Sequence, residues 1–222
     1  MYDRRMRHAL WVSLASLLLL GGCTRAPEPS LASAASRGDA AAVQAILDRG
    51  ADPNQTDGYG LTAVILAARA GSVPCVRTML EHGADPDRPG GVNGWTPLMH
   101  AVHKNQRATA QALLDCGADV DARNPNGVTA LIMAAGYGNT PMVELLLDRG
   151  ADLHAQAADG ATVFAAAVGG VPDIDNFTLG ACQISTIQAL KRRDPNLHLP
   201  DNFWGRTAKM AAVAAKLRGC PY

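Results

Sequence analysis

A tripeptide that returns at a fixed interval constrains this chain more than any other feature. Gly-Ala-Asp occurs four times with spacings of 33, 34 and 33 residues, at positions 50–52, 83–85, 117–119 and 150–152. A second series, Gly-x-Thr, has a closely similar period over its first four copies and starts at positions 60, 94, 127, 160 and 205. Two series with one period of this length indicate an array of similar structural units stacked on one another.

The fourth unit shows what each copy can fold into. Thr129 is a good N-cap because its hydroxyl can accept a hydrogen bond from a free amide of the first helical turn, and the small and apolar residues 130–135 follow it as a short helix. Pro141 suits the first turn of a second helix, which carries an apolar stripe between residues 143 and 147. Gly150 can take the left-handed conformation that ends a helix. The pattern predicts a helix–turn–helix–loop unit of about 33 residues.

This unit resembles the ankyrin repeat. The resemblance depends on two segments, Gly94-Trp95-Thr96-Pro97-Leu98 and Glu144-Leu145-Leu146-Leu147-Asp148-Arg149-Gly150-Ala151-Asp152. It covers residues 29–155 well and residues 156–220 loosely. The resemblance implies an all-α fold, an ankyrin-repeat solenoid of helix-turn-helix units with short β-hairpin-like loops.

We expect residues 31–222 to form one ankyrin-repeat domain with atypical ends, because terminal repeats have only one neighbour. The expected parts are an N-terminal capping repeat (29–56), regular repeats (57–92, 93–125 and 126–158), an interrupted repeat (159–200) and a C-terminal cap (201–222). The residues that interrupt the fifth repeat lie around 171–181.

The chain departs from the family at one position of the first helix. Ankyrin repeats commonly carry a histidine after Thr-Pro-Leu, where it ties neighbouring loops by hydrogen bonds. Here the position holds apolar residues, namely Ile65, Met99, Ile132, Ala165 and Met210. We therefore expect packing to replace a polar network, with a less rigid spacing between repeats.

The N-terminus has the layout of an export signal. Three arginines among residues 1–7 precede an apolar run over residues 10–20, which is shorter than the roughly 20 residues that span a bilayer. The run leads to Leu20-Gly21-Gly22-Cys23, which resembles the lipobox of bacterial lipoproteins. This likeness implies that residues 1–22 are a cleaved signal peptide and that lipid, including palmitate, is attached to Cys23. A plain secretory signal with a chance cysteine and an uncleaved membrane anchor are the alternatives.

A lipid on Cys23 would place the protein in the cell envelope. Two or more acyl chains anchor a protein stably, and residues 23–30 would form a short tether. Thr24 stands where an Asp would resemble an inner-membrane retention signal. The expected location is therefore the outer membrane, with the domain facing the periplasm.

Composition and motifs exclude several classes of function. The chain has 20 basic and 20 acidic side chains, so no basic face favours nucleic acid. No phosphate-binding glycine loop or nucleophile elbow occurs in a suitable context. We expect neither catalysis nor a cofactor, and a monomer is the expected state.

In ankyrin proteins the partner usually lies on the concave face, which is built from loop tips and first helices. Carried over residue by residue, the resemblance implies the partner-binding residues Tyr59, Leu61, Arg69, Arg88, Asn93, Trp95, His103, Lys104, Pro125, Val128 and Tyr137. The loop at residues 88–92 is one residue longer than its neighbours and is expected to shape this face. The alternative is that Tyr59 and Trp95 only pack between loop tips.

The interrupting segment is a second candidate surface. It contains Ile174 and Phe177 among acidic residues, and loops that break a regular scaffold often carry specificity. It could equally cover the last core helices. The cluster of Asp173, Asp175 and Asn176 offers too few ligands for a calcium site and is interpreted as a solvated loop.

His100 and His103 are three residues apart on one predicted helix, a spacing that could present a metal pair. The simpler interpretation is a half-buried His100 and an exposed His103 on the binding face. No metal site is therefore predicted.

The cysteines allow one structural prediction. Cys182 and Cys220 fall near the start of the second helices of adjacent units, so a disulfide between them could join the fifth repeat to the C-terminal cap. Cys75 and Cys116 are about 10 Å apart along the helix axes, too far for a disulfide, and are interpreted as buried apolar residues.

The sequence thus predicts a membrane-anchored, extracytoplasmic protein that binds a protein partner through its concave face and loops. Narrower versions are an immunity protein against a periplasm-acting toxin and a protector of periplasmic redox enzymes. The rival classes are a small-ligand or metal-binding envelope protein and a structural attachment to the envelope.

Overall fold

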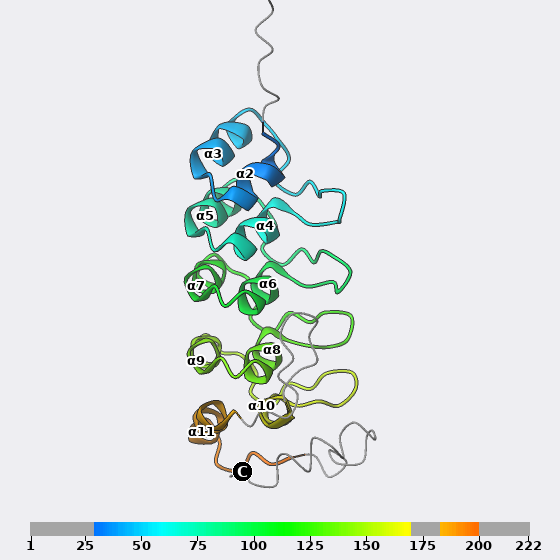
Figure 1. The fold of residues 1–222 in the computed structure, drawn as a ribbon, viewed down its shortest axis with the longest axis vertical. Helices are drawn as coiled ribbons and strands as arrows, with labels where there is room; N and C mark the ends of the chain where they lie inside the picture. Colours follow the sequence, from blue (N-terminus) through cyan, green and yellow to red (C-terminus); the bar gives the residue numbers. More distant parts are fainter. Residues whose placement is uncertain (1–28, 170–182, 200–222) are drawn as a thin grey trace, which may run out of the picture.

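The computed structural model describes residues 29–169 and 183–199, and these form a single stack of helical hairpins (Figure 1). Cys23, Ile174, Phe177, Cys182 and Cys220 lie outside the described residues, so the predictions made for them stay predictions. Within the described ranges, no helix is both long enough and apolar enough to cross a membrane.

The helices form two parallel rows. The inner row, which carries the loops, consists of α2 (Leu31–Arg37), α4 (Ala63–Ala70), α6 (Pro97–His103), α8 (Ala130–Gly136) and α10 (Val163–Gly169). The outer row consists of α3 (Ala40–Asp48), α5 (Val73–Glu81), α7 (Arg107–Asp115), α9 (Thr140–Asp148) and α11 (Ile184–Arg193). Each helix contacts its hairpin partner and the next helix of its own row. This arrangement confirms the predicted all-α solenoid.

The helices begin where the sequence places a capping side chain. The hydroxyl of Thr129 accepts a hydrogen bond of 3.3 Å from the Ile132 N–H, as predicted. Thr62, Thr96 and Thr162 cap α4, α6 and α10 in the same way. Each of these hydroxyls satisfies one of the amides that a helix start leaves without an intrahelical partner.

Small residues let the inner helices pack closely. One fully buried alanine recurs at the same register in every inner helix, at positions 35, 67, 101, 134 and 167. Larger buried side chains from the outer row, such as Met79, Leu113 and Leu146, fill the space between the rows. Because each hairpin buries its apolar side against its neighbours, the repeats are stable only as an array.

The apolar residues that replace the usual histidine are packed as expected. Ile65, Met99, Ile132 and Ala165 are all buried. A polar connection between repeats nevertheless exists elsewhere, at the turns that follow the outer helices α3, α5 and α7. Packing thus replaces the polar network at the histidine position, as predicted, and a different polar network joins the repeats at these turns.

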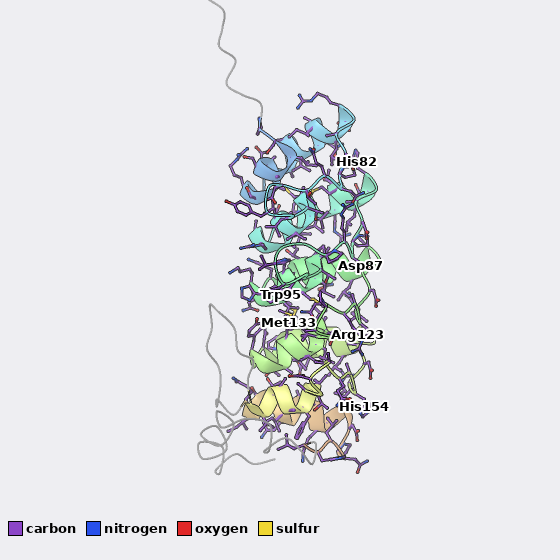
Figure 2. All side chains as sticks on the ribbon, turned by 90° about the vertical axis from the view of Figure 1, so that its right-hand side faces the viewer. His82, Asp87, Trp95, Arg123, Met133 and His154 are labelled. Atoms are coloured by element: carbon purple, nitrogen blue, oxygen red, sulfur yellow. The ribbon has the colours of Figure 1, made fainter. Side chains whose placement is uncertain are left out.

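This connection is a series of side-chain to backbone hydrogen bonds, which we call the loop ladder. Asn54 Oδ1 accepts from the Asp85 N–H at 2.8 Å. Asp87 and Asp121 accept in the same way from the backbone N–H groups of the next repeats, those of Asp119 (3.0 Å) and Asp152 (2.9 Å). Asp87 and His154 lie along one long edge of the stack, whereas Trp95 lies toward the opposite edge (Figure 2).

The loop ladder stops at the fourth repeat, where the equivalent position holds His154. Its Nε2 lies 3.7 Å from Asp194 Oδ2, so a pair of side chains, exposed at His154 and half-buried at Asp194, stands where the preceding repeats use a backbone amide. The contact between the fourth and fifth repeats is therefore chemically different from the three ladder contacts between the earlier repeats.

Replacing Asn54 by alanine is expected to lower the free energy of unfolding by about 1–2 kcal/mol, because the Asp85 N–H and the Gly83 carbonyl each lose a hydrogen-bond partner. Urea denaturation followed by circular dichroism measures the loss. His154→Ala is the matched control, because His154 occupies the same register and makes no ladder bond. Equal losses in both variants would show that the loop ladder contributes nothing.

Candidate functional site

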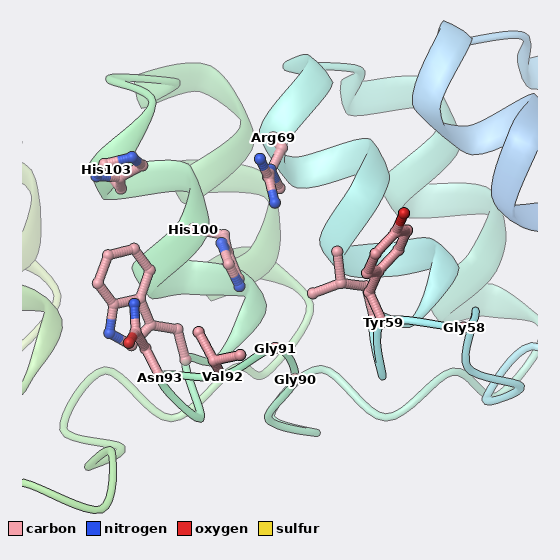
Figure 3. Close-up of a pocket in the computed structure, with 11 residues that line it drawn as sticks. Gly58, Tyr59, Arg69, Gly90, Gly91, Val92, Asn93, His100 and His103 are labelled. Atoms are coloured by element: carbon pink, nitrogen blue, oxygen red, sulfur yellow. The ribbon is translucent and has the colours of Figure 1, made fainter. Parts of the chain in front are cut away.

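A concavity of about 670 Å³ opens between two neighbouring loops and the inner helices α4 and α6 (Figure 3). Its lining residues come from the second and third repeats: Gly58, Tyr59, Leu61, Arg69, Gly90, Gly91, Val92, Asn93, Trp95, His100 and His103. We call this surface feature the concavity.

The first loop is held by one carboxylate. Asp57 Oδ1 accepts from the Tyr59 N–H at 2.8 Å and from the Leu61 N–H at 2.9 Å. This turn leaves Tyr59 84% exposed at the rim and places Leu61, which is buried, beneath it. The rim is therefore aromatic while the layer beneath it belongs to the core.

The second loop closes on its own backbone and touches the first. Gly90 and Trp95 exchange two backbone hydrogen bonds of 3.0 and 3.2 Å. A Cβ on Gly90 would lie 2.6 Å from the Gly60 carbonyl oxygen, so the two loops meet at a position that has room only for glycine. Val92, which follows in the longer loop, is fully exposed at the rim.

A cluster of aromatic rings lies beside the concavity. The Trp95 ring lies 5.4 Å from the His100 ring in an edge-on arrangement and 5.1 Å from the His103 ring, measured between centroids. His103 continues the contact into the fourth repeat, because its Nδ1 lies 3.1 Å from the Tyr137 hydroxyl. These contacts fix the Trp95 ring, which is half-buried.

His100 is buried under the second loop, with 7% of its surface exposed. The pKa of the ring is lowered to about 4, mainly by burial and also by the positive charges of Arg69, His103 and Lys104, while a hydrogen bond with the Gly90 backbone opposes the shift. The ring is therefore neutral at pH 7. Its Nε2 is buried and has no hydrogen-bond partner among the described residues.

The inner row carries positive charge and no acid. Its five helices contain no Asp or Glu, whereas Arg37 and Arg69 occur in them and Lys104 ends α6. The outer row contains acids in every helix except α11, and several are paired across repeats, as in the 3.0 Å contact of Arg149 with Asp115. The two long faces of the stack thus differ in charge.

The structure brings together part of the predicted partner-binding set. Six predicted residues line the concavity: Tyr59, Leu61, Arg69, Asn93, Trp95 and His103. Five others do not line it: Arg88, Lys104, Pro125, Val128 and Tyr137, although Tyr137 contacts His103. Leu61 is buried instead of exposed, and His103 is half-buried instead of exposed.

Five lining residues were not in the predicted partner-binding set: three glycines, Gly58, Gly90 and Gly91, together with Val92 and His100. The loop at residues 88–92 is one residue longer than its neighbours, and this extra length was the sequence signal that Val92 could lie at the concavity. His100 was interpreted as half-buried, which was wrong because the same loop covers its ring. In the described part of the chain no group of three or more His, Cys, Asp and Glu is placed to hold a metal ion. Cys75 is buried and Cys116, against expectation, half-buried; both are free thiols.

The chain is a stack of helical hairpins whose concavity, on the loop side, is lined by aromatic side chains and an arginine. These features define a repeat protein that binds a ligand or partner. Sequence profiles of ankyrin repeats match residues 31–124, as three copies, and residues 113–167, as part of many copies. The chain belongs to the ankyrin-repeat family. Proteins of this family generally mediate protein–protein interactions and are typically not enzymes. No curated protein matches the chain.

Proposed function

We propose that the chain is a membrane-anchored, extracytoplasmic ankyrin-repeat protein that binds a protein partner through its concave inner face and loops. The observation that carries the binding role is the concavity. It presents Tyr59, Val92 and Trp95 on a rigid scaffold, and the first two are strongly exposed. Exposed aromatic side chains next to arginine are the residues that most often dominate binding energy at interfaces.

The proposed anchor and location are supported by the sequence of the first 23 residues. Arginines, an apolar run and Leu20-Gly21-Gly22-Cys23 follow one another in the order of a lipoprotein signal. A lipid on Cys23 would hold the domain close to the outer membrane on its periplasmic side. The partner would then be a protein that reaches that membrane surface.

The anchor has a direct test. Cells expressing the full chain are fed labelled palmitate, and we expect label on the unaltered protein and none on Cys23→Ala, which should also leave the membrane fraction. Cys116→Ala is the matched control, because it removes a half-buried cysteine of the repeat stack. Label retained by Cys23→Ala would contradict the anchor and leave the binding role unaffected.

The binding role is tested by crosslinking in intact cells, followed by recovery of the full chain and its crosslinked partner. We expect Tyr59→Ala and Trp95→Ala each to reduce the recovered partner about tenfold or more. Gln188→Ala, an exposed change on α11 far from the concavity, is the control. Because Tyr59 is 84% exposed, its loss should leave the melting temperature unchanged. Undiminished recovery in both variants would contradict binding at this site.

A further inference from the structure

The concavity contains a polar atom that the fold does not use. Among the described residues only two buried side-chain polar atoms have no hydrogen-bond partner, His100 Nε2 and Thr109 Oγ1, and only His100 lines the concavity. Leaving such a group without a hydrogen-bond partner costs free energy. The equivalent position in the neighbouring repeats holds Leu66 and Met133, so an imidazole is not needed for packing there.

The hydrogen-bonding role of this atom follows from its ring. The contact with the Gly90 backbone favours the protonated imidazole, so the ring donates in that contact and the carbonyl accepts. A neutral imidazole has one donor and one acceptor nitrogen, and Nε2 is therefore the acceptor. A ligand that forms a hydrogen bond with His100 Nε2 must donate it from an N–H or an O–H.

The positive charge beside this acceptor indicates which second chemical group the bound ligand must carry. Arg69 lines the concavity, is exposed, and makes no ion pair with any residue in the described ranges. No acidic residue lines the concavity. Figure 3 shows Arg69 and His100 lying between Tyr59 on one side and Asn93 and His103 on the other. An unopposed guanidinium in such a setting is complementary to a carboxylate.

We propose that the concavity holds an acidic peptide segment of the partner protein. A carboxylate of the segment pairs with Arg69, a backbone N–H or hydroxyl beside it donates to His100 Nε2, and an apolar side chain of the segment packs against Trp95 and Val92. The inference rests on the proposed function and specifies the chemistry of its partner. The phosphodiester group of a lipid offers only acceptors and would leave His100 unsatisfied, whereas a peptide supplies an N–H at nearly every residue.

The test starts from a displayed library of random twelve-residue peptides, selected on the detergent-solubilised full chain. We expect the enriched peptides to share Asp or Glu within two residues of an aromatic or aliphatic side chain. The most enriched peptide is then synthesised and titrated against variants by fluorescence anisotropy. Arg69→Gln and His100→Leu are each expected to weaken its binding at least about tenfold.

Two controls separate this result from general effects. Arg77→Gln removes an exposed arginine from the outer helix α5 and should leave the affinity unchanged. His100→Leu places in the third repeat the residue that the second repeat already has at Leu66, so its fold should persist, as circular dichroism will verify.

Other outcomes would overturn the inference. These are the absence of any enriched peptide, enrichment of basic or uncharged peptides, and equal affinity in all variants. If Arg69→Gln weakens the binding of protein-free phosphatidylglycerol vesicles and His100→Leu does not, the concavity would be assigned to an anionic lipid surface instead, because the lipid anchor is the same in both variants. Should crosslinked partner recovery depend on Tyr59 and Trp95 but not on Arg69 and His100, the proposed function would stand and this inference would fail.

Discussion

Titration of His100 is expected to lower the free energy of unfolding of the unaltered protein by about 3 kcal/mol between pH 6.5 and pH 4. Replacing His100 by leucine is expected to abolish this decrease. The pKa of His100 is about 4 in the folded protein against 6.5 for an ordinary histidine. Between these values the unfolded chain binds a proton that the folded chain does not, so the free energy of unfolding falls as the pH falls. Below about pH 4 both states are protonated and the loss stops. Each unit of pKa difference corresponds to about 1.4 kcal/mol, which gives the total.

The measurement is the difference in free energy of unfolding between His100→Leu and the unaltered chain, from urea titrations at several pH values. Carboxylates such as Asp87, whose pKa burial raises, also titrate in this range, but they are present in both proteins and cancel. His154→Ala removes an exposed histidine, and its difference curve should vary by less than about 1 kcal/mol. A flat curve for His100→Leu would show that the ring is not buried as described.

Placing an alanine at Gly90 is expected to lower the free energy of unfolding by about 2–3 kcal/mol. The added Cβ would lie 2.6 Å from both the Gly60 carbonyl oxygen and Ile65 Cδ1. One of these contacts is with backbone, so relief requires the two loops to separate, and overpacking of this kind typically costs 1–3 kcal/mol. Because the two loops form the walls of the concavity, peptide and partner binding should fall as well.

Gly58→Ala is the matched control for this experiment. Gly58 also lines the concavity, and a Cβ there would meet no atom within 4 Å. Its alanine variant should melt within a few degrees of the unaltered protein and bind equally well. Thermal denaturation by circular dichroism compares the pair. Equal stability of the two variants would mean that the loops do not make the close contact on which the shape of the concavity depends.

The fold could be predicted almost completely because its signals are local and repeated. The prediction of a helix over residues 130–135, capped by Thr129, differs from the observed α8 (Ala130–Gly136) by one residue. The interrupted repeat, expected over residues 159–200, contains its second helix as α11 (Ile184–Arg193). Caps and apolar stripes lie within one helix, and a period of 33 residues repeats the same signal several times.

The loop ladder was missed because its partners are about 31 residues apart in sequence. Asn54 is an ordinary turn residue until the Asp85 amide of the next repeat is placed beside it. Aligned repeats would have shown polar residues at positions 54, 87 and 121, which is the signal that was available. A similar separation in sequence explains Leu61, because the loop that lies against it is the one that carries Gly90 and Gly91.

The concavity itself could be located but not described from sequence. The family resemblance led to Tyr59 and Trp95 because it assigns a face to each register position. The burial of His100 depends on how the loop that carries Gly90 and Val92 covers the ring, and that follows from loop conformation. An unsatisfied acceptor is a property of atoms in space, so no pattern of residue types could reveal it.

The end of the loop ladder at His154 makes the last described joint of the stack responsive to ionic strength. Its polar contacts include the exposed ion pairs of Arg192 with Glu144 and of Arg193 with Asp148, together with that of His154 with Asp194. Mobile ions screen such exposed pairs, whereas they act less on the hydrogen bonds to backbone amides that the earlier joints have in addition to their own ion pairs. Concentrated electrolyte should therefore loosen the fifth repeat first and leave the concavity between the second and third repeats intact.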